Sequence, residues 1–142
     1  MEEISIVYHD KNMPKLKQIE NGNWIDLYTI EDVNFLKGDF QLISLGVSMK
    51  IPDGYEAIVI PRSSTFLKYG IIQANSVGLI DTSYCGNNDI WKFPAYATRN
   101  TRIPKYTRIC QFRILKSMDK INFVETESLG NCNRGGFGST GD

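Results

Sequence analysis

Short runs of β-branched and aromatic residues recur along the chain at intervals of about ten residues, separated by turn-forming pieces such as NGN, KGD, PDG and CGNN. The runs are ISIVY (4–8), WIDLYTI (24–30), FQLISLGVSM (40–49), YEAIVIP (55–61), GIIQA (70–74), VGLID (77–81), TRICQFRIL (107–115) and INFVET (121–126). This spacing is typical of an all-β sandwich or jelly roll.

Alternation within two of these runs predicts which faces are buried. In RICQFRIL, one face is expected to join the core and the other can hold polar groups; the core face is Cys110, Phe112 and Ile114, and the other face is Gln111 and Arg113 with Ile109 and Leu115. In VGLID, a buried strand formed by Val77, Leu79 and Ile80 is expected to place Asp81 at a turn.

The segment PRSSTFLKYG is the only stretch with a helical pattern. Ser63 or Ser64 can cap its N-terminus, apolar Phe66 and Leu67 follow, and Gly70 can adopt the left-handed conformation that ends a helix. At about two turns, this helix depends on packing against the rest of the fold.

Composition predicts one domain and a tail. The chain has 142 residues, 42% of them hydrophobic, and its 16 basic residues balance 16 acidic ones, so no bulk charge favours nucleic acid or membrane surfaces. Without an apolar run long enough to span a bilayer, it is expected to be cytoplasmic. Residues 1–129 form the expected β-rich domain, and 130–142 a flexible glycine-rich arm. Cys85, Cys110 and Cys132 lack zinc-site spacing and are expected to be reduced thiols.

Two motifs carry candidate chemistry. PRSS places Arg62 beside two hydroxyls at a helix start, an arrangement that binds anions, although a capped helix with a solvated arginine is an equal alternative. NSVGLIDTSYCG places Asp81 after an apolar strand with Tyr84 three residues on, so that Asp81 could act as a general base. The alternative is an aspartate that only forms the turn.

Other single residues are more typical of packing or turns than of a site. His9 is the only histidine, which excludes Ser-His-Asp and Cys-His mechanisms. Asp26 in WIDLY and the pair Trp91 and Phe93 are weak candidates by themselves. The terminal GGFGSTGD lacks the following helix of a dinucleotide site, but its backbone and hydroxyls could surround phosphate oxygens; a disordered terminus is the alternative.

The order of these motifs resembles that of the homotrimeric dUTPases, particularly a Bacillus and phage-like branch. WIDLY, PRSS, NSVGLIDTSYCG, RICQF and a terminal GGFGSTG follow one another from Trp24 to Gly141. The resemblance implies a jelly-roll-like β fold, three sites at subunit interfaces and hydrolysis of dUTP to dUMP and pyrophosphate. This reaction keeps uracil out of DNA and supplies dUMP for thymidylate synthesis.

The resemblance also implies roles for individual residues. Asp81 would activate the water that attacks the α-phosphorus, and Tyr84 would pack on the deoxyribose and reject UTP. Asn75 and the hairpin from Gly78 to Asp81 would bind uracil, with Ile80 excluding the thymine methyl. The phosphates would be bound by Arg62, Ser63, Ser64 and Gln111. Mg²⁺, chelated mainly by the triphosphate, would be reached by Asp26 through water.

The tail resembles the arm that closes over bound nucleotide in this family. Phe137 would stack on uracil, and phosphate contacts would come from Gly138, Ser139 and Thr140. The usual motif has arginine five residues before the phenylalanine, where this chain has Cys132, so Arg134 would have to reach the γ-phosphate instead. We therefore hypothesise that Trp91 or Phe93 supplies the cover over uracil instead of Phe137.

Two other functions remain as alternatives. The related dCTP deaminases share the RSS element, but their chemistry resembles a glutamate-based site, and this chain has no glutamate between Glu56 and Glu125. Some phage dUTPases act by docking onto a regulatory protein partner. The loop 85–98, with Trp91, Phe93 and Tyr96, could form such a surface if the protein is phage-derived.

Overall fold

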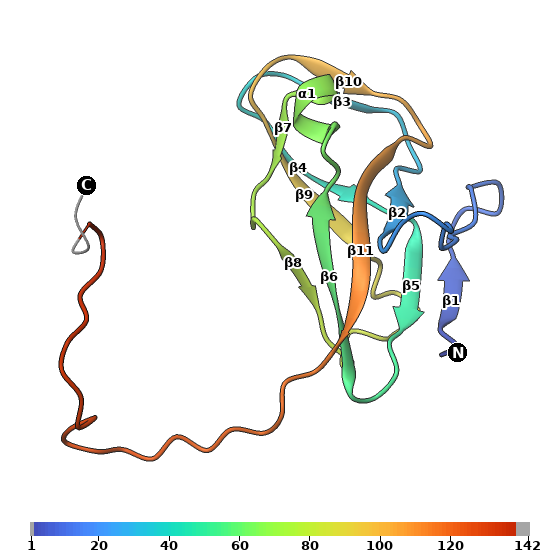
Figure 1. The fold of residues 1–142 in the computed structure, drawn as a ribbon. Helices are drawn as coiled ribbons and strands as arrows, with labels where there is room; N and C mark the ends of the chain where they lie inside the picture. Colours follow the sequence, from blue (N-terminus) through green and yellow to red (C-terminus); the bar gives the residue numbers. More distant parts are fainter. Residues whose placement is uncertain (1, 139–142) are drawn as a thin grey trace.

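A computed structural model describes residues 2–138 of the chain, so Ser139 and Thr140 lie outside the described residues. Antiparallel strands and one short helix make up the fold, as predicted (Figure 1). The elements in order are β1 (Ser5–Tyr8), β2 (Ile25–Tyr28), β3 (Val33–Phe35), β4 (Phe40–Ser44), β5 (Val47–Lys50), β6 (Tyr55–Pro61), α1 (Thr65–Tyr69), β7 (Ile71–Gln73), β8 (Gly78–Ile80), β9 (Lys92–Ala97), β10 (Thr101–Ile103) and β11 (Arg108–Lys116).

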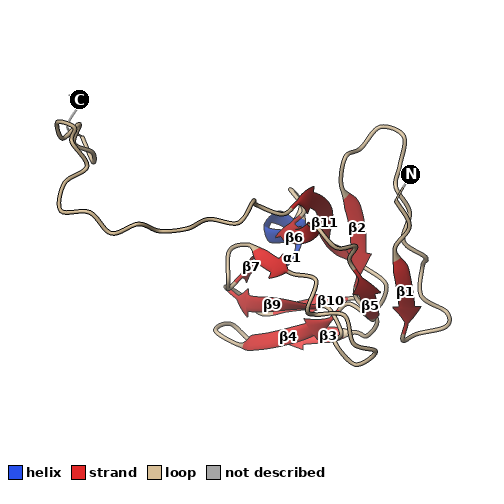
Figure 2. Ribbon diagram, turned by 90° about the horizontal axis from the view of Figure 1, so that it is seen from below, coloured by secondary structure: helices blue, strands red, loops and turns tan. Residues whose placement is uncertain are grey.

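Two larger sheets form the body. The first has the order β2-β11-β6-β8 and the second β4-β9-β7, and Figure 2 shows β4 and β9 on one side with β6 and β11 on the other. Smaller pairs, β1 with β5 and β10 with β3, complete it. Leu27 and Phe112 from the first sheet share one buried cluster with Ile43 and Phe93 from the second. Burial of this cluster is the main source of stability.

Strand β11 alternates largely as predicted. Cys110 and Phe112 are buried, Ile114 packs against the core, and Gln111 and Arg113 are half-buried. Ile109, which was expected on the polar face, is fully buried. The pairing with β2 shifts register between Arg108 and Cys110, and such a bulge turns the extra residue toward the other face.

Strand β8 lies at the edge of its sheet, and its predicted burial is wrong. Leu79 is 78% exposed and Val77 is also exposed, whereas Ile80 is half-buried against the core. Among the described residues β8 pairs only with β6, so one face and one edge are left open.

Two other runs differ from the prediction. FQLISLGVSM forms two strands, β4 and β5, because the chain turns at Gly46, where φ is 69° and a Cβ would lie 2.5 Å from Ile30 Cγ2. INFVET forms no strand. The backbone N–H of Ser117 donates to Gly54 O at 2.9 Å, and beyond it the described residues run as an exposed extended segment away from the body (Figure 1).

The predicted helix is present, with a different N-terminal contact. Ser64 is the N-cap by position but makes no capping hydrogen bond. The buried hydroxyl of Thr65 instead fixes the turn before the helix: it accepts from the Arg62 N–H at 2.9 Å and donates to Ile109 O at 2.8 Å. Gly70 ends the helix in the left-handed region with φ of 64°, as expected.

Candidate active site

One cluster of predicted site residues lies at the end of β6, next to α1. Arg62 Nε is 3.1 Å from Asp26 Oδ1, and Arg108 Nη1 is 3.6 Å from Asp26 Oδ2. The Gln111 side chain donates to Pro61 O at 3.2 Å. Asp26 lies in β2, Arg108 and Gln111 lie in β11, and Arg62 directly follows β6; these three strands are adjacent in the first sheet. The arrangement orients two guanidinium groups around one carboxylate, at the surface.

Arg108 was not singled out from the sequence. Its position in TRICQF, three residues before Gln111, is the only signal, and its pairing with Asp26 depends on the bulged register of β2 and β11.

The two serines of PRSS lie at the start of α1 with their hydroxyls uncommitted. Ser63 is exposed and Ser64 half-buried, and neither side chain makes a hydrogen bond within residues 2–138. Because Thr65 makes the local contacts of the turn, both hydroxyls remain available to a ligand. Donors beside a fixed cation suit an anion such as phosphate.

A second cluster surrounds Asp81, directly after β8. Asp81 Oδ1 accepts hydrogen bonds from the Ser83 backbone N–H at 2.9 Å and from the Ser83 hydroxyl. These bonds, the hydroxyl first, lower the pKa of Asp81 below its ordinary value of 3.8. Asp81 is exposed, so it is an ionised carboxylate open to water. It shapes the turn and can still accept a proton.

A cavity of about 360 Å³ joins Asp81 to other predicted residues. Its wall is made by Leu42, Asn75, Leu79, Ile80, Asp81, Ser83, Tyr84, Lys92 and Pro94. The Tyr84 hydroxyl donates to Ile90 O at 2.9 Å, which fixes the ring at the edge of the cavity. Gly78 lies in β8 beside Val59, where a Cβ would come within 3.2 Å of Val59 Cβ. The structure thus brings Asn75, Ile80, Asp81 and Tyr84 together around one cavity.

The two clusters lie at opposite ends of β6. Ile80 pairs with Ala57 near the start of β6, whereas Arg62 follows its last residue. Strand residues rise about 3.3 Å each, so Arg62 and Asp81 are separated by about 20 Å along the sheet. Figure 1 shows β8 running away from α1 toward the far end of β6. One chain therefore does not bring the two clusters together.

The arm residues lie apart from both clusters. Arg134, Phe137 and Gly138 belong to the extended segment and are exposed (Figure 1). Phe137 has a positive φ of 49° and its ring is fully exposed.

The hypothesis that Trp91 or Phe93 covers uracil is wrong. Trp91 is 1% exposed and Phe93 is 0% exposed, and the Trp91 ring packs edge-on against Phe112 with centroids 5.2 Å apart. A side chain without surface cannot stack on a ligand. The segment 85–98 is also not a loop throughout, because β9 occupies much of it. Of the aromatic residues expected in a docking surface, only Tyr96 is exposed, so Trp91 and Phe93 cannot contribute to it.

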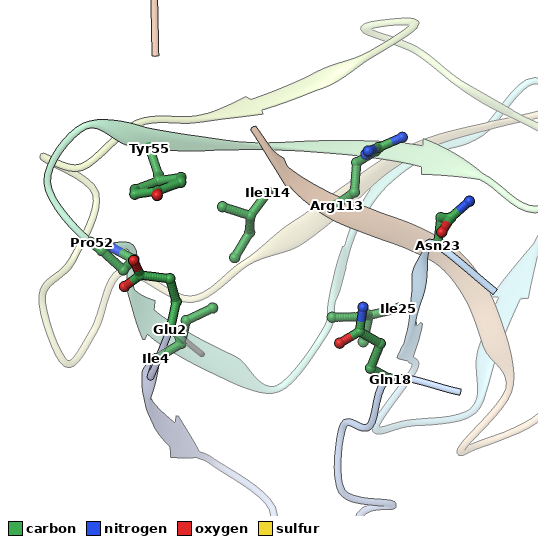
Figure 3. Close-up of a pocket in the computed structure, with 9 residues that line it drawn as sticks. All are labelled: Glu2, Ile4, Gln18, Asn23, Ile25, Pro52, Tyr55, Arg113 and Ile114. Carbon is green, nitrogen blue, oxygen red and sulfur yellow. The ribbon is translucent and has the colours of Figure 1, made fainter. Parts of the chain in front are cut away.

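Another cavity lies between the N-terminal segment before β1 and the sheet of β2 and β11 (Figure 3). It has about 470 Å³ and is lined by Glu2, Ile4, Gln18, Asn23, Ile25, Pro52, Tyr55, Arg113 and Ile114. The Arg113 guanidinium lies 5.5 Å from the centre of the Trp24 ring. None of the residues predicted for the site lines this cavity, so we do not assign it to substrate.

The metal prediction rests on Asp26 alone. Both Asp26 carboxylate oxygens face arginines, and residues 2–138 contain no group of three potential metal-ligating side chains. Contact of Asp26 with Mg²⁺ through water therefore stays a prediction. The single described helix, α1, is too short to cross a membrane.

Solved structures show what class of fold this is. The chain superposes on the dUTPase of Staphylococcus bacteriophage 80alpha, solved as a variant with dUpNHpp, with a TM-score of 0.80, 20% identity and full coverage of both chains. The dUTPase of Streptococcus mutans gives a TM-score of 0.73 at 21% identity over 85% of this chain and 100% of that chain. The predicted jelly-roll-like fold is therefore the dUTPase fold.

Sequence relatives establish the family. The dUTPase family model matches residues 12–141. The SPbeta prophage-derived deoxyuridine 5'-triphosphate nucleotidohydrolase YosS of Bacillus subtilis (strain 168) is 53% identical over 139 residues, 98% of each chain. The deoxyuridine 5'-triphosphate nucleotidohydrolase of Finegoldia magna is 36% identical over 144 residues, 97% of this chain and 98% of that one. The chain belongs to the dUTPase family, the hydrolases that convert dUTP to dUMP and pyrophosphate.

Proposed function

We propose that this dUTPase works as a homotrimer in the cytoplasm, with each active site built from more than one subunit. The observation that carries the proposal is the separation of about 20 Å between Arg62 and Asp81 within one chain. In dUTP, only two bridging oxygens separate the α- from the γ-phosphorus. A nucleotide whose α-phosphate lies beside Asp81 therefore needs the Arg62 cluster of a second subunit.

Asp81 is the proposed general base. Its ionised carboxylate is exposed at the mouth of the cavity and takes a proton from the water that attacks the α-phosphorus. Ser83 fixes the carboxylate through two hydrogen bonds. The attack gives dUMP and releases pyrophosphate.

The cavity beside Asp81 is the proposed nucleoside site. Asn75 and the backbone from Gly78 to Asp81 bind the uracil edge, and Ile80 at the wall opposes a 5-methyl group. Tyr84, held by its hydroxyl, packs on the deoxyribose and leaves no room for a 2′-hydroxyl. A steric clash is needed against dTTP, because an apolar pocket discriminates weakly against one added group.

The cluster at α1 is the proposed phosphate site. The groups that would contact the phosphates are Arg62, Ser63, Ser64 and Gln111, with Asp26 holding the Arg62 guanidinium in place. Mg²⁺, brought with the triphosphate, would neutralise phosphate charge, and Asp26 would reach it through water.

The arm is the third proposed contribution. Met118, Ile121, Phe123 and Val124 are exposed in the segment between the body and the arm. Such apolar side chains favour docking onto a neighbouring subunit, where the INFVET run could pair as a strand. Residues 130–142 then close over the nucleotide, with Phe137 on uracil and Arg134 at the γ-phosphate. With Trp91 and Phe93 buried, Phe137 is the aromatic residue left for this role.

Product analysis tests the proposed base and the specificity. The purified protein is incubated with Mg²⁺ and, separately, dUTP, UTP, dTTP and dCTP, and the reactions are repeated with Asp81→Asn. The proposal expects dUMP and pyrophosphate from dUTP alone, and loss of turnover in the variant. Hydrolysis of UTP at a similar rate, or an active Asp81→Asn, would contradict the assigned residues.

A further inference from the structure

Lys92 projects into the proposed nucleoside site although no sequence motif pointed to it. Strand β9 alternates between exposed and buried positions, so Lys92 faces outward while its neighbour Phe93 faces the core. The outward side chains Lys92 and Pro94 both line the cavity that contains Asp81.

The backbone at Lys92 is held firmly from both sides. The Trp91 N–H donates to Val47 O at 2.9 Å, and Trp91 O accepts from the Leu45 N–H at 2.9 Å. The Trp91 and Phe93 side chains are both buried. The aromatic residues that we expected to touch the substrate therefore fix the direction in which Lys92 points. Tyr84 is tied to the same segment through Ile90 O.

Among residues 2–138, no carboxylate forms an ion pair with Lys92. Lys92 is the only cation in the wall of the cavity and Asp81 the only anion, yet within residues 2–138 the two form no ion pair. The Asp81 carboxylate is instead hydrogen-bonded to Ser83. An ammonium group on a flexible stem beside a cavity for an anionic ligand favours contact with that ligand's charge.

We propose that Lys92 binds the α-phosphate of the nucleotide from the same subunit that supplies Asp81. This inference rests on the proposed assignment of the cavity to the nucleoside. It gives the Asp81 side of the site a cation of its own, separate from the Arg62 cluster of the neighbouring subunit. The ammonium group would hold the α-phosphate close to Asp81 and keep dUMP bound after pyrophosphate leaves.

Binding of dUMP and deoxyuridine, which differ only by the α-phosphate, separates phosphate contact from base contact. Isothermal titration compares the full-length wild-type protein with Lys92→Met and Lys92→Arg. Lys50→Met, which removes an exposed lysine from β5, controls for the change in net charge. We expect Lys92→Met to weaken dUMP binding about 5- to 20-fold and deoxyuridine binding less than about twofold. Lys92→Arg and Lys50→Met should stay within about threefold of the wild type for dUMP.

Other results would overturn the inference in different ways. Unchanged dUMP binding in Lys92→Met, or equal losses for dUMP and deoxyuridine, would show that Lys92 does not contact the phosphate. A loss of the same size in Lys50→Met would attribute the effect to overall charge. Failure of the wild type to bind either compound would contradict the assignment of the cavity, and the inference with it.

Discussion

The Asp81 carboxylate accepts two hydrogen bonds from Ser83, and they hold its pKa below the ordinary value of 3.8. A general base must be ionised to accept a proton. With a lowered pKa, Asp81 stays ionised as the pH falls through the usual aspartate range, and kcat/KM should fall only below that range.

Ser83→Ala tests this pH dependence. The variant loses the hydroxyl bond, which is the largest cause of the lowered pKa, and keeps the backbone bond. The pKa of Asp81 should rise toward 3.8, so the acid limb of the kcat/KM profile should move to higher pH. Ser5→Ala, an exposed serine on β1, is the control. An acid limb at the same pH in Ser83→Ala would contradict the role of Asp81 as the titrating base.

Asp26→Asn tests whether Asp26 orients the phosphate-binding arginine. The KM of the variant for dUTP should rise about 3- to 10-fold, because Arg62 loses the charge that holds its guanidinium in place. Folding stability should change little, because a partly exposed ion pair contributes little to it. Asp32→Asn removes a comparable ion pair with Arg102, at 3.1 Å, away from the site. Steady-state kinetics at saturating Mg²⁺ measure KM in both variants. Equal KM values for Asp26→Asn and Asp32→Asn would contradict the role of Asp26 in orienting Arg62.

Single residues were predicted well where local chemistry decides their position. Asp81 follows the strand β8 and Arg62 precedes the helix α1, as their motifs indicate. Trp91 and Phe93 were misassigned because their burial depends on the opposite sheet, which one strand's sequence does not reveal. Arg108 was missed because its partner is set by a bulged register.

At the scale of elements, α1 depends on Gly70 at its C-terminal end. Gly70→Ala should destabilise the fold by about 1–2 kcal/mol, since a side chain is strained in the left-handed region. The added Cβ would also lie 2.6 Å from Arg99 Nε. Gly136→Ala, in the extended segment with no atom within 4 Å of the added Cβ, should leave the melting temperature unchanged. Equal melting temperatures in the two variants would contradict this account of the helix end.

Substitution of the phenylalanine in β9 and of the one in the arm should have opposite effects on stability and on nucleotide binding. Phe93→Ala should lower the free energy of unfolding by about 3–5 kcal/mol, because it leaves a cavity in the core. Phe137→Ala should leave stability unchanged and weaken dUTP binding about 5- to 100-fold through lost stacking. Denaturant unfolding and titration with a non-hydrolysable dUTP analogue measure the two effects. Unchanged nucleotide binding in Phe137→Ala would remove the arm's phenylalanine from the site.

The all-β class, most strands and the only described helix could be predicted because their signals are local. The burial of β8 could not, since an edge strand and a central strand of the same composition differ only in their neighbours. The sequence of β9 predicts a loop because polar residues precede the strand and Pro94 lies within it. INFVET has the composition of a strand but pairs with no other strand among residues 2–138.

For the whole molecule, the central claim is that Asp81 and Arg62 of one active site come from different subunits. Each chain carries the proposed nucleoside cavity at one end of β6 and the proposed phosphate cluster at the other. Closed symmetry then gives every copy the same pair of partners. In the proposed arrangement, the segment that leaves the body would reach a neighbouring subunit (Figure 1).

Mixing two inactive variants tests this claim most directly. Asp81→Asn and Arg62→Ala are co-expressed with different tags, mixed trimers are isolated, and dUTP hydrolysis is measured. In each mixed trimer one site in three has both residues intact, so the mixed trimers should recover about one third of wild-type activity. A control mixture combines Asp81→Asn with Asn75→Ala. Because both residues line the same cavity of one chain, no site in this mixture has both intact, and no activity should be restored. Absence of recovery in the first mixture, or full activity from a monomer of the unmodified protein, would contradict the account.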